Sequence, residues 1–321
     1  MKPKEILVFG GSGQIGRHLL RKLTRKNFRV TVVTRNIHRK GYVLKSSGNA
    51  GWIDIIELET FNYNKLSQIF KNKDICINLI GILNEKNKSS FNNMHTFLPK
   101  TLALLSKEHN LKQFIHLSAL GVDNANKSKY ALSKLNGETE IKNIFDKFVI
   151  LKPSLVYSVD DNFSTMLMSM LKLMPFFPIY YHGKTIFYPI HVTDMCEIIE
   201  NIIINETKKE TIECIGPEKI SFKELILKIL KSLEIYRPLL PMPLTIAKFV
   251  ATFFEIFMKN PLLTKDQLIS LNYNNEPSGK YKTNIDLKLN SKLKYFENEI
   301  LKYSYMWKNE GEFSKQKNKI N

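Results

Sequence analysis

A serine, a tyrosine and a lysine near the middle of the chain could together move a proton. Ser118 ends an apolar run over residues 112–118 that is typical of a strand, and Tyr130 and Lys134 follow at the start of a helical pattern. Positions i and i+4 share one face of a helix, so the phenol and the ammonium can point into the same cleft. A nearby cation lowers the pKa of a tyrosine from about 10, which favours proton exchange near neutral pH. These three side chains are therefore candidate catalytic residues.

The four-residue spacing of this tyrosine and lysine does not by itself identify a catalytic pair. The chain has 13 tyrosines and is rich in lysine, and Tyr180 and Lys184 repeat the spacing. That second pair spans Gly183 beside a proline-rich run, which is typical of a loop. Tyr130 and Lys134 differ because they follow the carboxyl end of a predicted strand, the edge where parallel sheets bind ligands. We therefore retain only the pair after Ser118.

A strand, a glycine turn and a helix open the chain and would position a dinucleotide. The apolar residues 6–9 lead into Gly10, Gly13 and Gly16, and a helical repeat of isoleucine and leucine follows. Gly10 permits the turn, Gly13 lets the backbone approach a pyrophosphate, and Gly16 lets the helix lie close to the strand. The phosphates would bind at the positive N-terminal end of that helix. The predicted contacts are Gly10, Ser12, Gly13, Gln14, Ile15 and Gly16.

The second predicted strand, residues 28–35, ends where a dinucleotide fold meets the adenosine ribose. An acidic residue there would accept hydrogen bonds from the 2′-hydroxyl of NAD, but the chain has Thr34 and Arg35, with Arg39 four residues further on. A guanidinium suits a 2′-phosphate in shape and charge. The sequence therefore favours NADP over NAD, the alternative being that both arginines are ordinary surface residues.

Further predicted strands over residues 52–58, 74–81, 112–118 and 148–151 alternate with helical patterns. This order is typical of an α/β fold with a doubly wound, Rossmann-like parallel sheet and right-handed crossovers. Strand ends at the same sheet edge add three cofactor contacts, namely Glu59, Asn78 and Gly81.

The predicted domains follow from the change in character after residue 156. Residues 1–156 form the dinucleotide-binding domain, to which 185–216 return. Residues 157–184 and 217–307 form a smaller, mostly helical C-terminal lobe, and the polar residues 308–321 form a disordered tail. Within the lobe, residues 239–258 are the most apolar stretch, but two prolines, Lys248 and Glu255 make it too short to span a bilayer. We expect residues 244–258 to make a dry packing contact, with exposure to a protein or lipid surface as the alternative.

Composition excludes several other classes of function. The net charge is +18, but lysine is spread along the chain and no face interleaves aromatic and basic residues, which disfavours nucleic-acid binding. The three cysteines are far apart, so neither a disulfide framework nor a zinc site is indicated, and His191 has no partner at metal-ligand spacing. The first strand begins almost at once, which leaves no room for a targeting peptide. We expect a reducing, cytoplasmic location, with peripheral attachment to the inner membrane as a further option.

The sequence resembles the short-chain dehydrogenase/reductase superfamily, in its extended and atypical branch, from the glycine turn to Asp194. A closer likeness, reaching to about residue 280, is to the NAD(P)H-binding accessory subunits of respiratory complex I and their bacterial relatives. It rests on residues 77–83 (INLIGIL), 118–121 (SALG), 151–154 (LKPS), 188–194 (YPIHVTD), 238–243 (PLLPMP) and 263–266 (LTKD).

The resemblance implies roles for the residues in matching positions. Tyr130 would be the general acid and base, Lys134 would hold the ribose and tune the tyrosine, and Ser118 would hydrogen-bond the reacting oxygen. Pro153, Ser154 and Leu155 would lie near the nicotinamide. The resemblance also implies respiratory complex subunits or the membrane surface as partners of the C-terminal lobe.

Three functions remain open from the sequence. The first is an NADP(H)-holding subunit of a respiratory or quinone-linked assembly, favoured by the whole-chain resemblance. The second is a free-standing NADP-dependent reductase, epimerase or dehydratase, favoured by Ser118, Tyr130 and Lys134. The third, a cofactor-sensing regulator, ranks last because it predicts a broken tyrosine and lysine pair.

Overall fold

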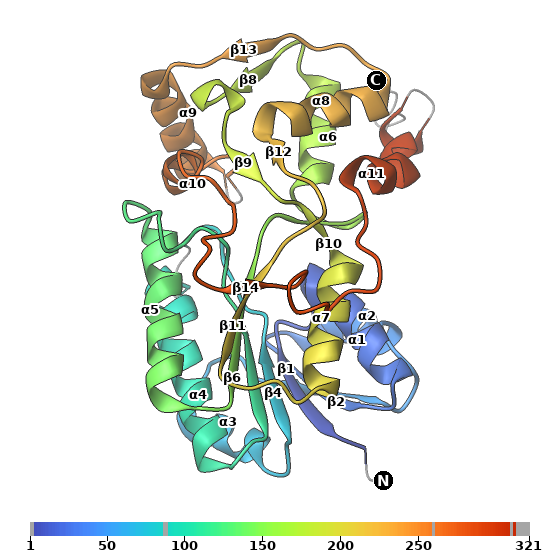
Figure 1. Ribbon diagram of the computed structural model, residues 1–321, viewed down its shortest axis with the longest axis vertical. Helices are drawn as coiled ribbons and strands as arrows, with labels where there is room; N and C mark the ends of the chain where they lie inside the picture. The colour runs from blue at the N-terminus through green and yellow to red at the C-terminus, as the bar shows by residue number, and fades with distance from the viewer. Residues whose placement is uncertain (1–2, 86–88, 259–260, 309–310, 313–321) are drawn as a thin grey trace. The chain divides into compact units, whose positions relative to one another are not determined.

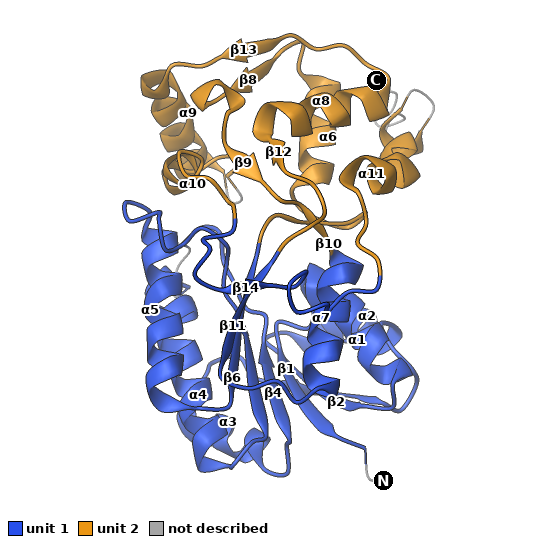
Figure 2. Cartoon of the chain, in the orientation of Figure 1, with its two compact units in different colours: residues 1–153, 192–214, 277–291 blue, residues 154–191, 215–276, 292–321 orange. Residues whose placement is uncertain are grey.

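A computed structural model describes residues 3–85, 89–258, 261–308 and 311–312. The chain divides into two compact units, each built from three stretches of sequence (Figure 2). Unit 1 comprises Met1–Pro153, Val192–Cys214 and Pro277–Ser291. Unit 2 comprises Ser154–His191, Ile215–Glu276 and Lys292–Asn321.

Unit 1 is built on one parallel sheet of eight strands in the order β14-β11-β6-β5-β4-β1-β2-β3. The chain leaves β1 in one direction to β2 and β3 and in the other to β4, β5 and β6, so the strand order reverses beside β1. This confirms the doubly wound fold. The strands are β1 (Glu5–Phe9), β2 (Arg29–Thr34), β3 (Ile53–Glu57), β4 (Ile75–Asn78), β5 (Gln113–Leu117), β6 (Phe148–Pro153), β11 (Glu210–Cys214) and β14 (Lys282–Thr283).

Helices cover both faces of this sheet (Figure 1). On one face lie α1 (Gln14–Arg25), α2 (Ile37–Ser46) and α7 (Val192–Ile204), and on the other lie α3 (Tyr63–Phe70), α4 (Leu98–Glu108) and α5 (Lys129–Ile144). Apolar side chains of β1, β4, β5 and β6 form one core cluster with those of α3, α4 and α5. Burial on both faces explains why these strands are continuous apolar runs.

Two features of unit 1 were not predicted from the sequence. The helix between β4 and β5 begins as a π-helix, Asn92–Phe97, and continues as α4. Residues 277–291, expected in the lobe, belong to unit 1 because β14 pairs with β11 and the buried Glu213 carboxylate accepts hydrogen bonds from Ser278 N and Oγ.

Unit 2 combines short strand pairs with helices. The pairs are β7 (Val156–Tyr157) with β10 (Ile190–His191), β8 (Phe177–Ile179) with β13 (Leu239–Pro241), and β9 (Ile186–Phe187) with β12 (Ile220–Ser221). The helices are α6 (Ser164–Leu173), α8 (Phe222–Leu233), α9 (Leu244–Phe257), α10 (Lys265–Ser270) and α11 (Phe296–Ser304). Apolar residues of α6, α8 and α11 form its main core.

In the predicted tail, Lys308 forms an ion pair with Glu234 at 2.6 Å, whereas residues 309–310 and 313–321 lie outside the described residues. Across the described parts of the chain, every helix is too short or too polar to cross a membrane.

Candidate dinucleotide site

The glycine turn between β1 and α1 has the tight geometry that its sequence predicts. Gly10 has a φ of +80°, and a Cβ on it would lie 2.9 Å from the carbonyl carbon of Leu79. A Cβ on Gly16 would lie 2.5 Å from the carbonyl oxygens of both Gly10 and Gly11. Side chains at these positions would collide with backbone that cannot move independently, so α1 can approach β1 only because glycine is present.

The N-terminus of α1 is built from backbone. Its N-cap is Gly13, which has no side chain to cap the helix, whereas Asn36 caps α2 and Ser128 caps α5 with side-chain oxygens. Gly13 N–H donates to Gly10 O at 3.0 Å, and the Arg17 guanidinium donates to Ser12 O at 2.9 Å. No carboxylate occurs in the first turn. This end of the helix therefore fits an anionic diphosphate in both shape and charge.

The residues expected to choose between the two dinucleotides lie where β2 ends. Thr34 is the last residue of β2 and is buried, and Arg35 directly follows it with Nη1 3.5 Å from Ser89 Oγ. The Arg39 guanidinium is exposed and has no acidic partner within the described residues. Glu57, at the end of the neighbouring β3, accepts a hydrogen bond from the backbone N–H of Ile37 at 2.8 Å.

Glu57 was not among the predicted site residues. Its signal was its place at the end of a strand beside β2. The predicted contact Glu59 lies two residues further on, exposed in the loop after β3.

The carboxyl ends of β4 and β5 carry buried polar side chains. Asn78 Nδ2 lies 3.1 Å from His116 Nδ1, and Asn78 Oδ1 accepts from Ile80 N–H at 3.1 Å. Burial lowers the pKa of His116 well below its usual range, with a smaller contribution from the Lys134 charge. Because Asn78 Nδ2 donates to His116 Nδ1, the hydrogen of the neutral imidazole ring lies on His116 Nε2. This Nε2 atom has no hydrogen-bond partner among the described residues. Asn78 thus shapes the strand end through contacts within the protein.

Lys134 lies buried at this edge, on α5. Its Nζ donates to Leu117 O at 2.8 Å, and a Cβ on Gly81 would lie 3.4 Å from it. The structure thus brings together Lys134 and Gly81, which the sequence places more than fifty residues apart. Burial lowers the pKa of Lys134 to about 8, although the Glu138 carboxylate opposes this shift.

Tyr130 packs against an aromatic cluster anchored by His95. The Tyr130 ring meets His95 and Phe91 edge-on, with centroids 5.3 and 5.9 Å apart. Ile82 N–H donates to His95 Nε2 at 3.0 Å, so the ring hydrogen lies on Nδ1, 2.9 Å from Ser133 Oγ. Ser133 Oγ donates in turn to Tyr130 O at 2.7 Å. His95, which the sequence analysis did not single out, connects the loop after β4 to α5.

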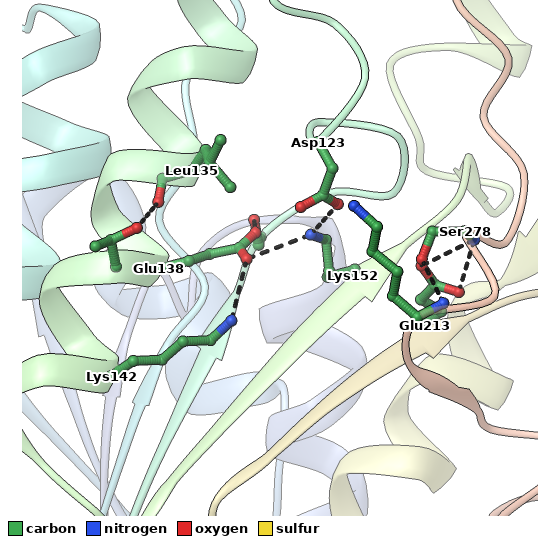
Figure 3. A network of polar contacts seen from close by, with 10 residues as sticks. Asp123, Leu135, Glu138, Lys142, Lys152, Glu213 and Ser278 are labelled. Carbon is green, nitrogen blue, oxygen red and sulfur yellow. Dashed lines mark hydrogen bonds and ion pairs between the residues drawn. The ribbon is translucent and has the colours of Figure 1, made fainter.

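Ser118 donates a hydrogen bond to a largely buried network of ion pairs among Glu138, Lys152, Asp123 and Lys142, and Figure 3 shows these four charged side chains. Its hydroxyl donates to Glu138, whose other carboxylate oxygen lies 3.3 Å from Lys152 Nζ. Lys152 is fully buried and also pairs with Asp123 at 2.5 Å, while Lys142 lies 4.0 Å from Glu138. Two ammonium groups thus face two carboxylates. Glu138 therefore contacts Ser118 through one carboxylate oxygen and Lys152 through the other.

The last three predicted contacts follow one another along the chain, where the first stretch of unit 1 ends and unit 2 begins. Pro153 ends β6 in unit 1, where its carbonyl accepts from Leu120 N–H at 2.9 Å. Ser154 and Leu155 begin a stretch of unit 2. There Ser154 Oγ accepts from Tyr188 N–H at 3.1 Å, and Leu155 O accepts from Ile190 N–H at 2.9 Å. His191 packs edge-on against Tyr157 with ring centroids 5.2 Å apart.

A parallel sheet with its strand reversal beside a glycine turn defines a dinucleotide-binding class of fold. In sequence, residues 6–214 match the NAD dependent epimerase/dehydratase family, and the chain belongs to this family. The predicted superfamily is thereby confirmed.

Relatives of known identity include subunits of a respiratory enzyme. The chain is 24% identical over 263 residues to the NADH-ubiquinone oxidoreductase 40 kDa subunit of Neurospora crassa, covering 81% of this chain and 68% of that protein. It is 25% identical over 266 residues to NADH dehydrogenase [ubiquinone] 1 alpha subcomplex subunit 9 of Mus musculus, covering 81% and 70%. It is also 23% identical over 193 residues to the ceramide reductase of Caulobacter vibrioides, covering 59% and 57%.

Solved structures of sugar-nucleotide enzymes share the fold. The UDP-N-acetylglucosamine 4-epimerase of Methanobrevibacter ruminantium is 18% identical with a TM-score of 0.66, covering 94% of this chain and 98% of that one. The dTDP-glucose 4,6-dehydratase of Streptomyces venezuelae, solved with NAD bound, is 16% identical with a TM-score of 0.68, covering 95% and 97%.

Proposed function

We propose that this chain is an NADP(H)-binding subunit of a respiratory, quinone-linked assembly, in which it holds the dinucleotide. The glycine turn carries the binding half of this proposal, because its helix N-terminus offers backbone N–H groups without a side-chain cap or a carboxylate. The assembly half is supported by the relatives from Neurospora and mouse, which are subunits of NADH-ubiquinone oxidoreductases. Its partners would be other subunits of such an assembly, at a membrane.

The preference for NADP rests on the groups at the end of β2. Arg35 and Arg39 offer two guanidinium groups, whereas the nearest strand-end carboxylate, Glu57, already accepts the Ile37 N–H. A 2′-phosphate carries close to two negative charges and is matched by a guanidinium in geometry as well as charge. The solved dehydratase from Streptomyces contains NAD, so this preference would distinguish the present chain from that neighbour.

Holding the cofactor is favoured over turnover by the hydrogen bonding of Ser118. When bound, a nicotinamide dinucleotide supplies or accepts a hydride, and Ser118 would have to donate a hydrogen bond to the reacting oxygen. The only hydroxyl hydrogen of Ser118 instead points to Glu138, which also forms an ion pair with Lys152. Ser118 can then accept a hydrogen bond but cannot donate one until this contact breaks.

A free-standing NADP-dependent reductase, epimerase or dehydratase is the second candidate. Tyr130 and Lys134 occupy one face of α5, and the Caulobacter relative is named a ceramide reductase. Under this alternative Tyr130 would exchange the proton and Lys134 would hold the ribose and the positive charge. Tyr130→Phe would then abolish turnover while cofactor affinity is largely kept.

Native purification followed by mass spectrometry distinguishes the two candidates. For a holding subunit we expect NADPH to remain bound and respiratory subunits to co-purify, and we expect no turnover with a panel of carbonyl compounds and nucleotide sugars. A monomer that reduces one of these substrates, and that loses this activity on Tyr130→Phe, would support the alternative and contradict the holding role.

A further inference from the structure

Helix α9, labelled in Figure 1, belongs to unit 2. Most of its apolar side chains are exposed. The sequence favoured a dry packing contact for this segment, and that prediction is wrong for its largest residues. Phe249 is 75% exposed, and Ile256 and Phe257 are each 70% exposed. Only Ala247 and Ala251 of this helix are buried.

The small buried residues explain how α9 is attached. Ala247 and Ala251 lie one turn apart and pack in a small cluster with Leu268 of α10. Glu255 adds a polar contact by accepting the Lys265 N–H at the start of α10, at 2.9 Å. Two alanines and one carboxylate thus help to attach the helix, while Phe249, Ile256 and Phe257 remain exposed.

The exposed residues form one continuous stripe, which we call the α9 stripe. Its members are spaced at three, four, three and one residues, so all lie on the same side of the helix, and they are Ile246, Phe249, Phe253, Ile256 and Phe257. The rings of Phe253 and Phe257 lie 4.6 Å apart along the stripe. A second, polar side of the helix carries Thr245, Lys248 and Thr252.

The size of the stripe argues against a protein interface formed by it alone. A helix of 14 residues is about 21 Å long and about 10 Å across, so the stripe covers roughly 200 Å². A stable protein interface buries about 800 Å² on each partner, including one between two copies of the same chain. The stripe also contains no tryptophan, tyrosine or arginine, the residues that dominate binding energy between proteins.

A lipid surface fits these properties. Phenylalanine and isoleucine on one side of a short helix, with a polar side beside it, are the composition of a helix that lies in the boundary layer of a membrane. Lys248 beside the stripe and the net charge of +18 add attraction to anionic headgroups. We infer that the α9 stripe inserts into the surface layer of an anionic lipid membrane. This peripheral contact goes beyond the proposed cofactor role and does not depend on it.

The inference can be tested with a fluorescent reporter on the stripe. In the full chain, Phe249→Trp should shift its emission to the blue with phosphatidylglycerol vesicles, and brominated acyl chains should quench it. The matched control is Leu227→Trp on α8, which is also exposed in unit 2 but lies outside the stripe and should show neither change. Equal responses from both tryptophans, or none from either, would overturn the inference.

Vesicle sedimentation provides the second arm. The combined change Phe249→Ser and Phe257→Ser should weaken binding to the anionic vesicles more than about tenfold. The thermal unfolding midpoint should stay unchanged, because both side chains are exposed. Leu227→Ser should bind as the wild type does. Binding that survives the double change, or a stripe-dependent dimer that does not bind vesicles, would contradict the lipid assignment.

Discussion

His95 shows how a single buried side chain can order the candidate site. It receives a hydrogen bond from Ile82 and lies within hydrogen-bond distance of Ser133, and its ring supports that of Tyr130. Burial lowers its pKa to about 3, with a smaller contribution from the Lys134 charge. The neutral ring is therefore the form that the folded protein requires.

We expect His95 to make the protein sensitive to acid. Its folded pKa of about 3 lies below the unfolded value near 6.5, so the unfolded chain binds more protons between these values. Stability contributed by the neutral ring is full above pH 6.5 and is lost as the pH falls toward 3. Between pH 7 and pH 5 the wild type should lose about 2 kcal/mol more unfolding free energy than His95→Gln.

Urea unfolding at the two pH values measures this difference. The control is His109→Gln at the residue that directly follows α4, where the imidazole contacts Ser67 Oγ at 2.9 Å. This variant should keep the acid sensitivity of the wild type. If His95→Gln keeps it too, the assignment to His95 is wrong.

Lys134 should give cofactor binding its own pH dependence. Its pKa of about 8 means that the ammonium is lost as the pH rises through 8, and with it an attractive charge for an anionic dinucleotide. We expect NADPH affinity to fall about tenfold between pH 7 and pH 9.5. Lys134→Met should bind weakly at both values, with a flat profile by fluorescence titration. An equal slope in the variant would assign the dependence to another group.

At the scale of elements, sequence patterns predicted those helices, strands and turns that depend on residues close together in the chain. The glycine spacing indicated the turn, and apolar runs between helical patterns indicated the parallel strands. The two-residue strand β14 was not predicted, because its pairing depends on β11, about seventy residues earlier. The π-helix at Asn92–Phe97 also escaped prediction. A Cβ on Gly137 of α5 would meet His95 O at 1.9 Å, a close approach between distant segments that no local pattern reports.

The close approach of α1 to β1 gives an element-scale prediction. Gly16→Ala would place a methyl group 2.5 Å from two backbone oxygens, so α1 must move away from the turn. We expect a loss of about 1–3 kcal/mol in unfolding free energy and at least about tenfold weaker NADPH binding. Gly41→Ala in α2 is the matched control, since its only close neighbour is a flexible side-chain atom at 3.2 Å, and it should be neutral or slightly stabilising.

Urea unfolding and calorimetric titration of both glycine variants check this prediction. Wild-type NADPH affinity in Gly16→Ala would show that the turn does not hold the diphosphate.

At the scale of the whole molecule, the sequence predicted the class of fold and the chemistry of one sheet edge, but not how side chains share their hydrogen bonds. Ser118 was expected to face a reacting oxygen, and its bond to Glu138 became visible only once β5 and α5 were placed together. The outward orientation of Phe249 likewise depends on which side of α9 the alanines occupy. Such features arise from tertiary contacts, which periodicity cannot reveal.

The central claim is that the glycine turn and Arg35 together bind NADP(H). Isothermal titration calorimetry of the full chain with NADPH and with NADH tests it most directly. We predict heat of binding with a dissociation constant at least about tenfold lower for NADPH, and a selective loss of NADPH affinity in Arg35→Asp. Equal affinities that Arg35→Asp leaves unchanged would contradict the choice of cofactor, and no heat with either dinucleotide would contradict the binding site itself.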